Sequence, residues 1–358
     1  MGRLLREIRH NPLLWLLVFV PALFASQALA PEAHTRLFFL SVLAIVPLAA
    51  LLSHATESVA AKTGDAAGGL LNATLGNLTE LVIALAALRA GQYMLVKASI
   101  AGAIVANTLF MLGMSFLLGG IKYHVQEFNR VNARLQSALL FLATVALLVP
   151  STVGEPESVF VRQLSVGLSV LLMAAYVLGL LFSLKTHREL FGAAEASGDH
   201  EAPWPLGMAV VTLLVVTVAV ALVSEIFVES VQAAAEDLGL TPAFVGFVVV
   251  ALVGAAAEMA AAFSGARKNR LDLSVGIALG SAVQIALFVA PVLVLVSYVV
   301  GPAPMTLQFW PGAVVMMFIA SMTAALVTNG GRSVWFTGVL VLTVYAVCAM
   351  ALYLMPPR

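Results

Sequence analysis

Two glutamates stand inside long apolar stretches, and they are the residues of this sequence best suited to bind a cation. Glu80 follows Gly-Asn-Leu-Thr at 76–79, and Glu258 follows Gly-Ala-Ala-Ala at 254–257. A charged acid at the centre of a membrane helix costs about 2.5–3.5 kcal/mol on insertion scales, so such residues usually face a polar interior and bind a ligand. A structural hydrogen bond from the protonated form explains one such residue, whereas two at matching positions favour a shared site.

Neutral oxygen donors accompany the first glutamate. Asn77 and Glu80 are three residues apart, which places them on one face of a helix. The amide carbonyl, the Thr79 hydroxyl and the carboxylate are hard oxygen ligands, which suit Ca²⁺ or Na⁺. We therefore expect four residues to bind the cation, namely Glu80, Glu258, Asn77 and Thr79, with the first three as its direct metal ligands.

Other polar residues in apolar segments are candidates for secondary ligands or for a proton pathway. They are Glu57, Glu225, Asn107, Ser281 and Gln284. For the two amides, an interhelical hydrogen bond is an equally good explanation. Desolvation disfavours the charged form of a buried carboxyl group and a bound cation favours it. Ion and proton therefore compete for the same oxygens, which predicts exchange of one for the other.

The composition indicates which elements position these residues. The chain has 358 residues, of which 61% are hydrophobic and 10% charged, against about 25% charged in a typical soluble domain. Because about 20 apolar residues span a bilayer as a helix, and because the segments do not alternate as barrel strands do, we expect an all-α polytopic membrane protein. The eleven predicted segments are 13–30, 37–60, 68–90, 95–119, 135–152, 162–183, 206–231, 241–266, 273–300, 306–328 and 333–355.

The positive charges predict the orientation in the bilayer. With the N-terminus cytosolic and eleven crossings, thirteen of the 18 Lys and Arg residues fall in cytosolic loops or tails, and the C-terminus is outside. The basic start of the first segment also resembles a signal peptide, but the charge bias favours a retained helix. Lys plus Arg equals Asp plus Glu, so net charge gives no indication of nucleic-acid binding.

An internal repeat relates the two halves of the chain at a fixed offset of 178 residues, the difference between positions 80 and 258. The pairs include Gly76 with Gly254, Glu80 with Glu258, Arg89 with Arg267 and Gly102 with Gly280. Each copy contains five predicted helices, and because five is odd the second copy enters the membrane from the opposite side, as in many secondary transporters. The predicted divisions are a tail and leading helix at 1–36, the first repeat at 37–183, a cytosolic connector at 184–205 and the second repeat at 206–358.

Two stretches resemble the calcium/proton antiporters of the cation/calcium exchanger superfamily. They are the segment 55–91, which contains Gly-Asn-Leu-Thr-Glu, and the segment 280–297, which begins Gly-Ser-Ala-Val-Gln-Ile-Ala-Leu-Phe. The resemblance implies an eleven-helix bacterial inner-membrane protein that exchanges Ca²⁺ for H⁺ without a cofactor. It implies an ion site between the third and eighth segments, with Glu80, Asn77 and Glu258 at ligand positions. It also implies that Glu57 and Glu225 help ions or protons to pass.

The second signature departs from the family pattern. Where the family usually has Gly-Asn-Ala-Ala-Glu-His, this chain has Gly-Ala-Ala-Ala-Glu-Met at 254–259, so Ala255 and Met259 replace an amide and an imidazole. Weaker Ca²⁺ binding, exchange of Na⁺ or K⁺ against H⁺, and compensation by Gln284 or Ser281 all remain open. An intramembrane enzyme is disfavoured because the sequence has no HExxH motif, and paired acids in an inverted repeat favour a carrier over a channel. The oligomeric state is left open.

Overall fold

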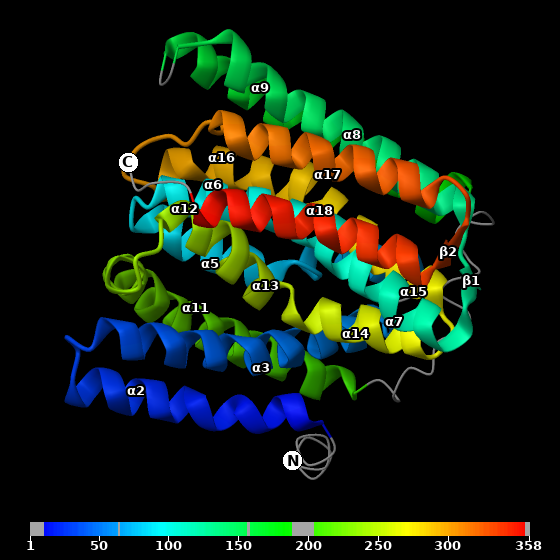
Figure 1. Ribbon diagram of the computed structural model, residues 1–358. Coiled ribbons are helices and arrows are strands. Elements are labelled where there is room, and N and C mark those ends of the chain that lie inside the picture. The colour runs from blue at the N-terminus through cyan, green and yellow to red at the C-terminus, as the bar shows by residue number, and fades with distance from the viewer. Residues whose placement is uncertain (1–10, 64, 156–157, 188–203, 355–358) are drawn as a thin grey trace.

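The computed structural model describes residues 11–63, 65–155, 158–187 and 204–354, and these are almost entirely helical (Figure 1). Most of the predicted connector at 184–205 and the basic N-terminal tail lie outside the described residues. In chain order the elements are η1 (Pro12–Val18), α2 (Phe19–Leu29), α3 (His34–Ala60), α4 (Asp65–Leu75), α5 (Leu78–Arg89), α6 (Tyr93–Val105), η2 (Ala106–Met111), α7 (Leu112–Tyr123), β1 (Val125–Glu127), α8 (Arg130–Val153), α9 (Val159–Leu181), η3 (Phe182–Thr186), α11 (Leu206–Asp237), α12 (Pro242–Phe244), η5 (Val245–Val250), α13 (Ala251–Gly254), α14 (Ala256–Arg267), α15 (Leu271–Gln284), η6 (Ile285–Val289), α16 (Ala290–Val300), α17 (Pro311–Thr328), β2 (Arg332–Val334) and α18 (Trp335–Tyr353).

The long helices confirm an integral membrane protein. Within the described ranges, nine helices are long and apolar enough to cross a bilayer, or ten if the pair 242–254 and 256–267, bent by 60°, is one span. The segment predicted at 68–90 is not among them, because it is divided into α4 and α5 around Gly76 and Asn77. Polar and glycine residues inside apolar segments explain both interruptions.

The helix boundaries of the two halves correspond at the offset that relates Glu80 to Glu258. At this offset α5 coincides with α14 at both of its ends, and the first residue of α6 coincides with the first residue of α15. The π-helical turns η2 and η6 end at Met111 and Val289, which are also equivalent positions. Turns of this kind inside α-helices are frequent at functional sites. Equivalent positions in the sequence therefore occupy equivalent local structures.

The helices around the two interruptions pack closely. Helix α3 lies along α11 (Figure 1), and α6 packs across the η5 turn. A Cβ atom at Gly102 would overlap the backbone of Phe247, so glycine is what permits this crossing. This packing brings together five helices in the interior, namely α3, α5, α6, α13 and α14.

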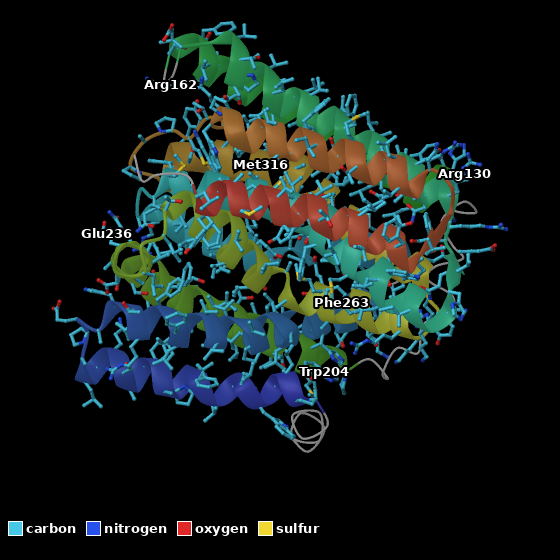
Figure 2. The ribbon with its side chains drawn as sticks, viewed as in Figure 1. Arg130, Arg162, Trp204, Glu236, Phe263 and Met316 are labelled. Carbon is cyan, nitrogen blue, oxygen red and sulfur yellow. The ribbon has the colours of Figure 1, made fainter. Side chains whose placement is uncertain are left out.

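Charged side chains gather at the two ends of the bundle. Figure 2 shows Arg130 at one end of the helices, and Arg162 and Glu236 at the opposite end. At the first end, β1 pairs antiparallel with β2, with Gln126 opposite Ser333. This small sheet was not predicted, because three-residue strands carry almost no alternating pattern.

Candidate cation-binding site

Two helix breaks position the glutamates. Helix α4 ends before Gly76 and α5 begins after Asn77, while α13 ends at Gly254 and α14 begins at Ala256. Glu80 and Glu258 consequently stand in the first turns of α5 and α14, where the helix dipole favours negative charge. A Cβ atom on Gly254 would lie 3.0 Å from Glu80 Cγ, so the Glu80 side chain lies directly against the break of the other half.

The two glutamates line one small cavity between α3 and the two breaks. Its lining residues are Ala49, Leu52, Ser53, Leu75, Gly76, Thr79, Glu80, Gly254, Ala257 and Glu258. The carboxylates of Glu80 and Glu57 both lie close enough to Glu258 to interact with it electrostatically. The structure therefore brings together the two acids and Thr79 from segments that are far apart in the sequence.

One oxygen of each glutamate is buried without a partner. Neither Glu80 Oε1 nor Glu258 Oε2 has a hydrogen-bond partner among the described residues. A buried carboxylate without a partner is unfavourable by several kcal/mol or more. Each of these oxygens therefore requires a proton or a cation.

A hydrogen-bonded chain of polar side chains holds Asn77 beside this cavity. Asn77 Nδ2 donates to Gln284 Oε1 at 2.5 Å, and Ser281 Oγ donates to Asn77 Oδ1 at 2.8 Å. Asn107 Nδ2 donates to Ser281 Oγ at 2.8 Å. Three of the residues singled out as secondary in the sequence, Asn107, Ser281 and Gln284, thus make interhelical hydrogen bonds. These bonds fix the orientation of the Asn77 amide.

The other two acids lie outside the cavity lining. Ser53, which lines the cavity, donates through Oγ to Glu57 Oε1 at 3.4 Å, and Glu57 is exposed. Glu225 Oε1 instead forms an ion pair with Arg89 Nη1 at 3.1 Å. No sequence pattern indicates this pair, because its members are 136 residues apart and on different helices.

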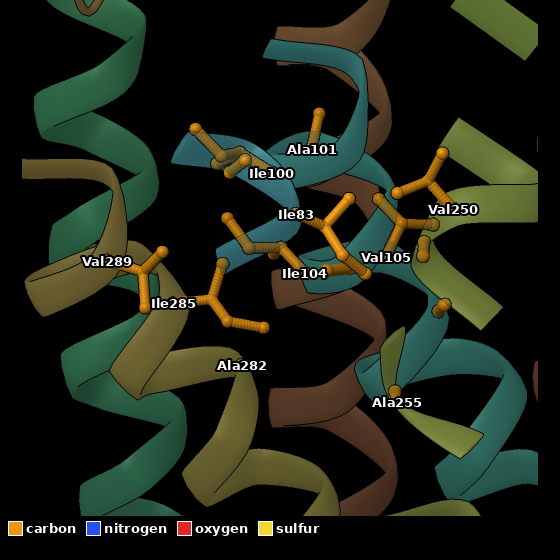
Figure 3. Close-up of a cluster of buried hydrophobic side chains, with 14 of the residues drawn as sticks. Ile83, Ile100, Ala101, Ile104, Val105, Val250, Ala255, Ala282, Ile285 and Val289 are labelled. Carbon is orange, nitrogen blue, oxygen red and sulfur yellow. The ribbon is translucent and has the colours of Figure 1, made fainter. Parts of the chain in front are cut away.

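A second small cavity meets Glu80 from the opposite direction and is almost wholly apolar. It is lined by Glu80, Ile83, Ala84, Ser99, Ile100, Ala103, Val250, Ala251, Ile285 and Val289. Figure 3 shows the aliphatic side chains of Ile83, Ile100, Val250, Ile285 and Val289 gathered there. Sequence reasoning missed Ser99, the hydroxyl group of this cavity, because a lone serine in a helix is not distinctive.

The donor set limits what the site can bind. No group of three or more His, Cys, Asp or Glu in the described part of the chain is arranged to hold a metal ion. Two carboxylates with a threonine hydroxyl and an oriented amide nearby form an oxygen-only set, which suits hard cations. Ala255 and Met259, the departures from the family signature, are both buried.

Comparison with known proteins places these features in one family. The model for the sodium/calcium exchanger protein family matches residues 34–185 and 208–354. The chain is 41% identical to a Ca²⁺/H⁺ antiporter of Synechocystis sp., covering 95% of this chain and 96% of the relative. It is 40% identical to the Ca²⁺/H⁺ antiporter ChaA of Bacillus subtilis, covering 89% and 92%.

A solved structure has the same fold. The native YfkE structure superposes with a TM-score of 0.84 at 35% identity, covering 96% of this chain and all of that one. The H⁺/Ca²⁺ exchanger CAX, at 15% identity, matches in fold with a TM-score of 0.71. Family model, relatives and fold agree with the signature residues around Glu80, and the chain belongs to the sodium/calcium exchanger family and, within it, to the calcium/proton antiporters.

Proposed function

We propose that this protein exchanges Ca²⁺ for H⁺ across a membrane by alternating access, with no cofactor. The observation that carries the proposal is a pair of glutamates, one from each half, that line one cavity. Each has one buried carboxylate oxygen without a hydrogen-bond partner among the described residues. The relatives named as Ca²⁺/H⁺ antiporters, at 41% and 40% identity, support Ca²⁺ over Na⁺ or K⁺ as the exchanged cation.

The same carboxylates bind both substrates. When Ca²⁺ occupies the site, Glu80 and Glu258 neutralise its two charges, with Asn77 and Thr79 supplying neutral oxygens. When Ca²⁺ leaves, the two buried oxygens take up protons, because burial without any partner is too unfavourable. Movement between the two sides then occurs only with ion or protons bound, and this couples the two fluxes.

Glu57 and Glu225 serve the two access routes in this proposal. Helix α3 runs from Ser53 to Glu57 away from the cavity, and the exposed Glu57 carboxylate makes it the entry on that side. The apolar cavity separates Glu80 from the opposite end, where Arg89 and Glu225 pair. Aliphatic side chains close the site on the side of Arg89 and Glu225, whereas the side of Glu57 is polar. This arrangement fits a conformation that is open toward Glu57.

We also propose eleven crossings, made by a leading helix and two inverted five-helix repeats with the divisions 1–36, 37–183, 184–205 and 206–358. The broken pair α4 and α5 is then the eleventh span, equivalent to α12–α14. Figure 1 supports an odd number, since the first span, Pro12–Leu29, begins near the end of the bundle opposite to the one where α18 ends.

The end that carries β1 and β2 is then cytosolic in a bacterial inner membrane. The positive-inside tendency supports this orientation. The residues at this end include Lys122, Arg130, Arg134, Arg267, Lys268, Arg270 and Arg332.

Proteoliposomes test the function directly. A Ca²⁺ gradient imposed on reconstituted protein should drive proton movement in the opposite direction, and equal gradients of Na⁺ or K⁺ should not. Glu80→Gln and Glu258→Gln should each reduce this proton movement by about 100-fold or more, because the neutral amide cannot exchange a proton for a cation. Glu32→Gln is the matched control, since the Glu32 side chain is 95% exposed. Full exchange in either buried variant would refute the site.

A further inference from the structure

The amide of Asn77 lies at the first helix break, residues 76–77, and is held by two partners. The repeat counterparts of Asn77 and of both partners are alanines. Ser281 donates to the Asn77 carbonyl, and Gln284 accepts from the Asn77 amide nitrogen. A Cβ atom on Gly76 would lie 3.3 Å from Gln284 Oε1, so Gln284 reaches the break itself. At the offset that relates Glu80 to Glu258, the counterparts of Asn77, Ser281 and Gln284 are Ala255, Ala103 and Ala106.

These three alanines belong to the apolar interior, and Ala103 lies beside Glu80. All three are buried within the hydrophobic core. Ala103 lines the aliphatic cavity that meets Glu80. Figure 3 shows Ala255 in the same buried cluster as Val105 and Val250. An amide and both of its partners are therefore absent together at the second break, while the glutamate is kept.

We propose that Ala103, Ala106 and Ala255 form a specificity-determining apolar wall of the cation site, so that neutral side-chain oxygens reach the ion from one break only. The inference rests on the proposed exchange function and concerns the same site. Ca²⁺ prefers six to eight oxygen ligands, and its affinity follows ligand number and rigidity. Because the wall has no side-chain oxygens at the second break, Ca²⁺ has fewer ligands there. Ca²⁺ therefore binds more weakly and is released faster.

The three positions act as a unit because a single polar substitution creates a buried group without a partner. The Asn77 amide is favourable where Ser281 and Gln284 satisfy both of its ends. An asparagine placed alone at Ala255 would meet aliphatic neighbours, and an unsatisfied buried amide is destabilising. By their correspondence with Ser281 and Gln284 in the repeat, serine at 103 and glutamine at 106 would provide the donor and acceptor. The effects of the substitutions should therefore be strongly non-additive.

A set of reconstituted variants tests the wall. Ala255→Asn alone, and Ala103→Ser with Ala106→Gln, should each lower the melting temperature of the purified protein and give no lower KM for Ca²⁺. The triple variant should regain most of the lost melting temperature and lower the KM about tenfold, as expected for one or two added ligands to a charged ion. The inference is overturned if Ala255→Asn alone lowers the KM as far, or if the triple variant equals the product of the separate effects.

A smaller pair keeps the test decisive if the triple variant does not fold. Ala255→Ser with Ala103→Ser adds one oxygen atom at each position, and the pair should lower the KM more than the product of the two single changes. A KM for the double variant equal to the product of the two single effects would contradict the wall. The parent protein separates this inference from the function on which it rests. A parent without Ca²⁺-driven proton movement refutes the exchange function, whereas an active parent with uncoupled alanine positions refutes only the wall.

Discussion

At the first break the chain leaves α4 at Leu75 and enters α5 at Leu78, and at the second it leaves α13 at Gly254 and enters α14 at Ala256. Each half thereby presents one glutamate in the first turn of a 12-residue helix. The first break adds a buried, hydrogen-bonded amide, whereas the second adds a buried methyl group. The two halves therefore have the same acidic residue after the break and differ in the neutral side chain at the break.

In the proposed function, this difference separates two tasks of the cation site. Neutralising a divalent ion, or taking up protons in its place, needs both carboxylates, and neither half can supply the pair alone. Ligand number, by contrast, sets how tightly the ion binds, and it can differ between the halves without stopping exchange. A repeat can thus lose its amide while keeping its acid, as long as the apolar surroundings change with it.

The pH dependence of Ca²⁺ affinity tests the shared feature and should be the largest effect. If two protons leave when one Ca²⁺ binds, the apparent KM should rise by up to about 100-fold for each pH unit of acidification, because ligands must be deprotonated to bind metal. Initial rates of Ca²⁺ uptake at several fixed pH values give the slope. A rise in the apparent KM of about tenfold for each pH unit would mean that only one carboxylate releases a proton. The glutamates of the two halves would then differ in protonation as well.

Asn77→Ala tests the feature that only the first half has. The change removes the amide and leaves Ser281 and Gln284 without their partner, at a cost of about 1–3 kcal/mol for each unsatisfied buried group. We expect a rise in the KM for Ca²⁺ of about 30-fold, with exchange retained, because the ion loses one oxygen ligand and keeps both carboxylates. Ala255→Gly is the counterpart change at the second break, and its effect on the KM should be much smaller, about threefold at most, since it removes no oxygen ligand. An equal rise in the KM for Asn77→Ala and Ala255→Gly would contradict the proposed difference between the two breaks.

The sequence predicts much of this arrangement because its signals are local. Glutamates inside apolar segments point to the site, and the repeat that pairs Glu80 with Glu258 relates the two halves, but both breaks fall within segments predicted as single spans, 68–90 and 241–266. The amide partners are recognisable by type, but the sequence does not show which residue each one contacts. That choice depends on the rotation of α15 against α5, which is set by packing throughout the bundle. The ion pair between Arg89 and Glu225 was missed for the same reason.

Ser281→Ala gives the smallest effect and sharpens the comparison most finely, because it makes position 281 identical to its counterpart Ala103. The hydroxyl links Asn107 to Asn77, and its loss leaves both side chains less constrained without removing an amide from the site. We expect a loss of about 1–2 kcal/mol in stability, as for other buried hydrogen bonds, seen as a lower melting temperature. The KM for Ca²⁺ should rise only severalfold.

Ser169→Ala is the matched control for this variant. It deletes a buried hydroxyl that bonds to the Ser165 carbonyl within its own helix, α9. Its melting temperature should change less, and its KM should stay at the parent value. If Ser281→Ala matched this control in KM, the hydroxyl would only stabilise the fold, and the orientation of the Asn77 amide would have to come from Gln284 alone. A change in KM confined to Ser281→Ala would instead show that the hydrogen-bonded chain around the first break tunes the ion site.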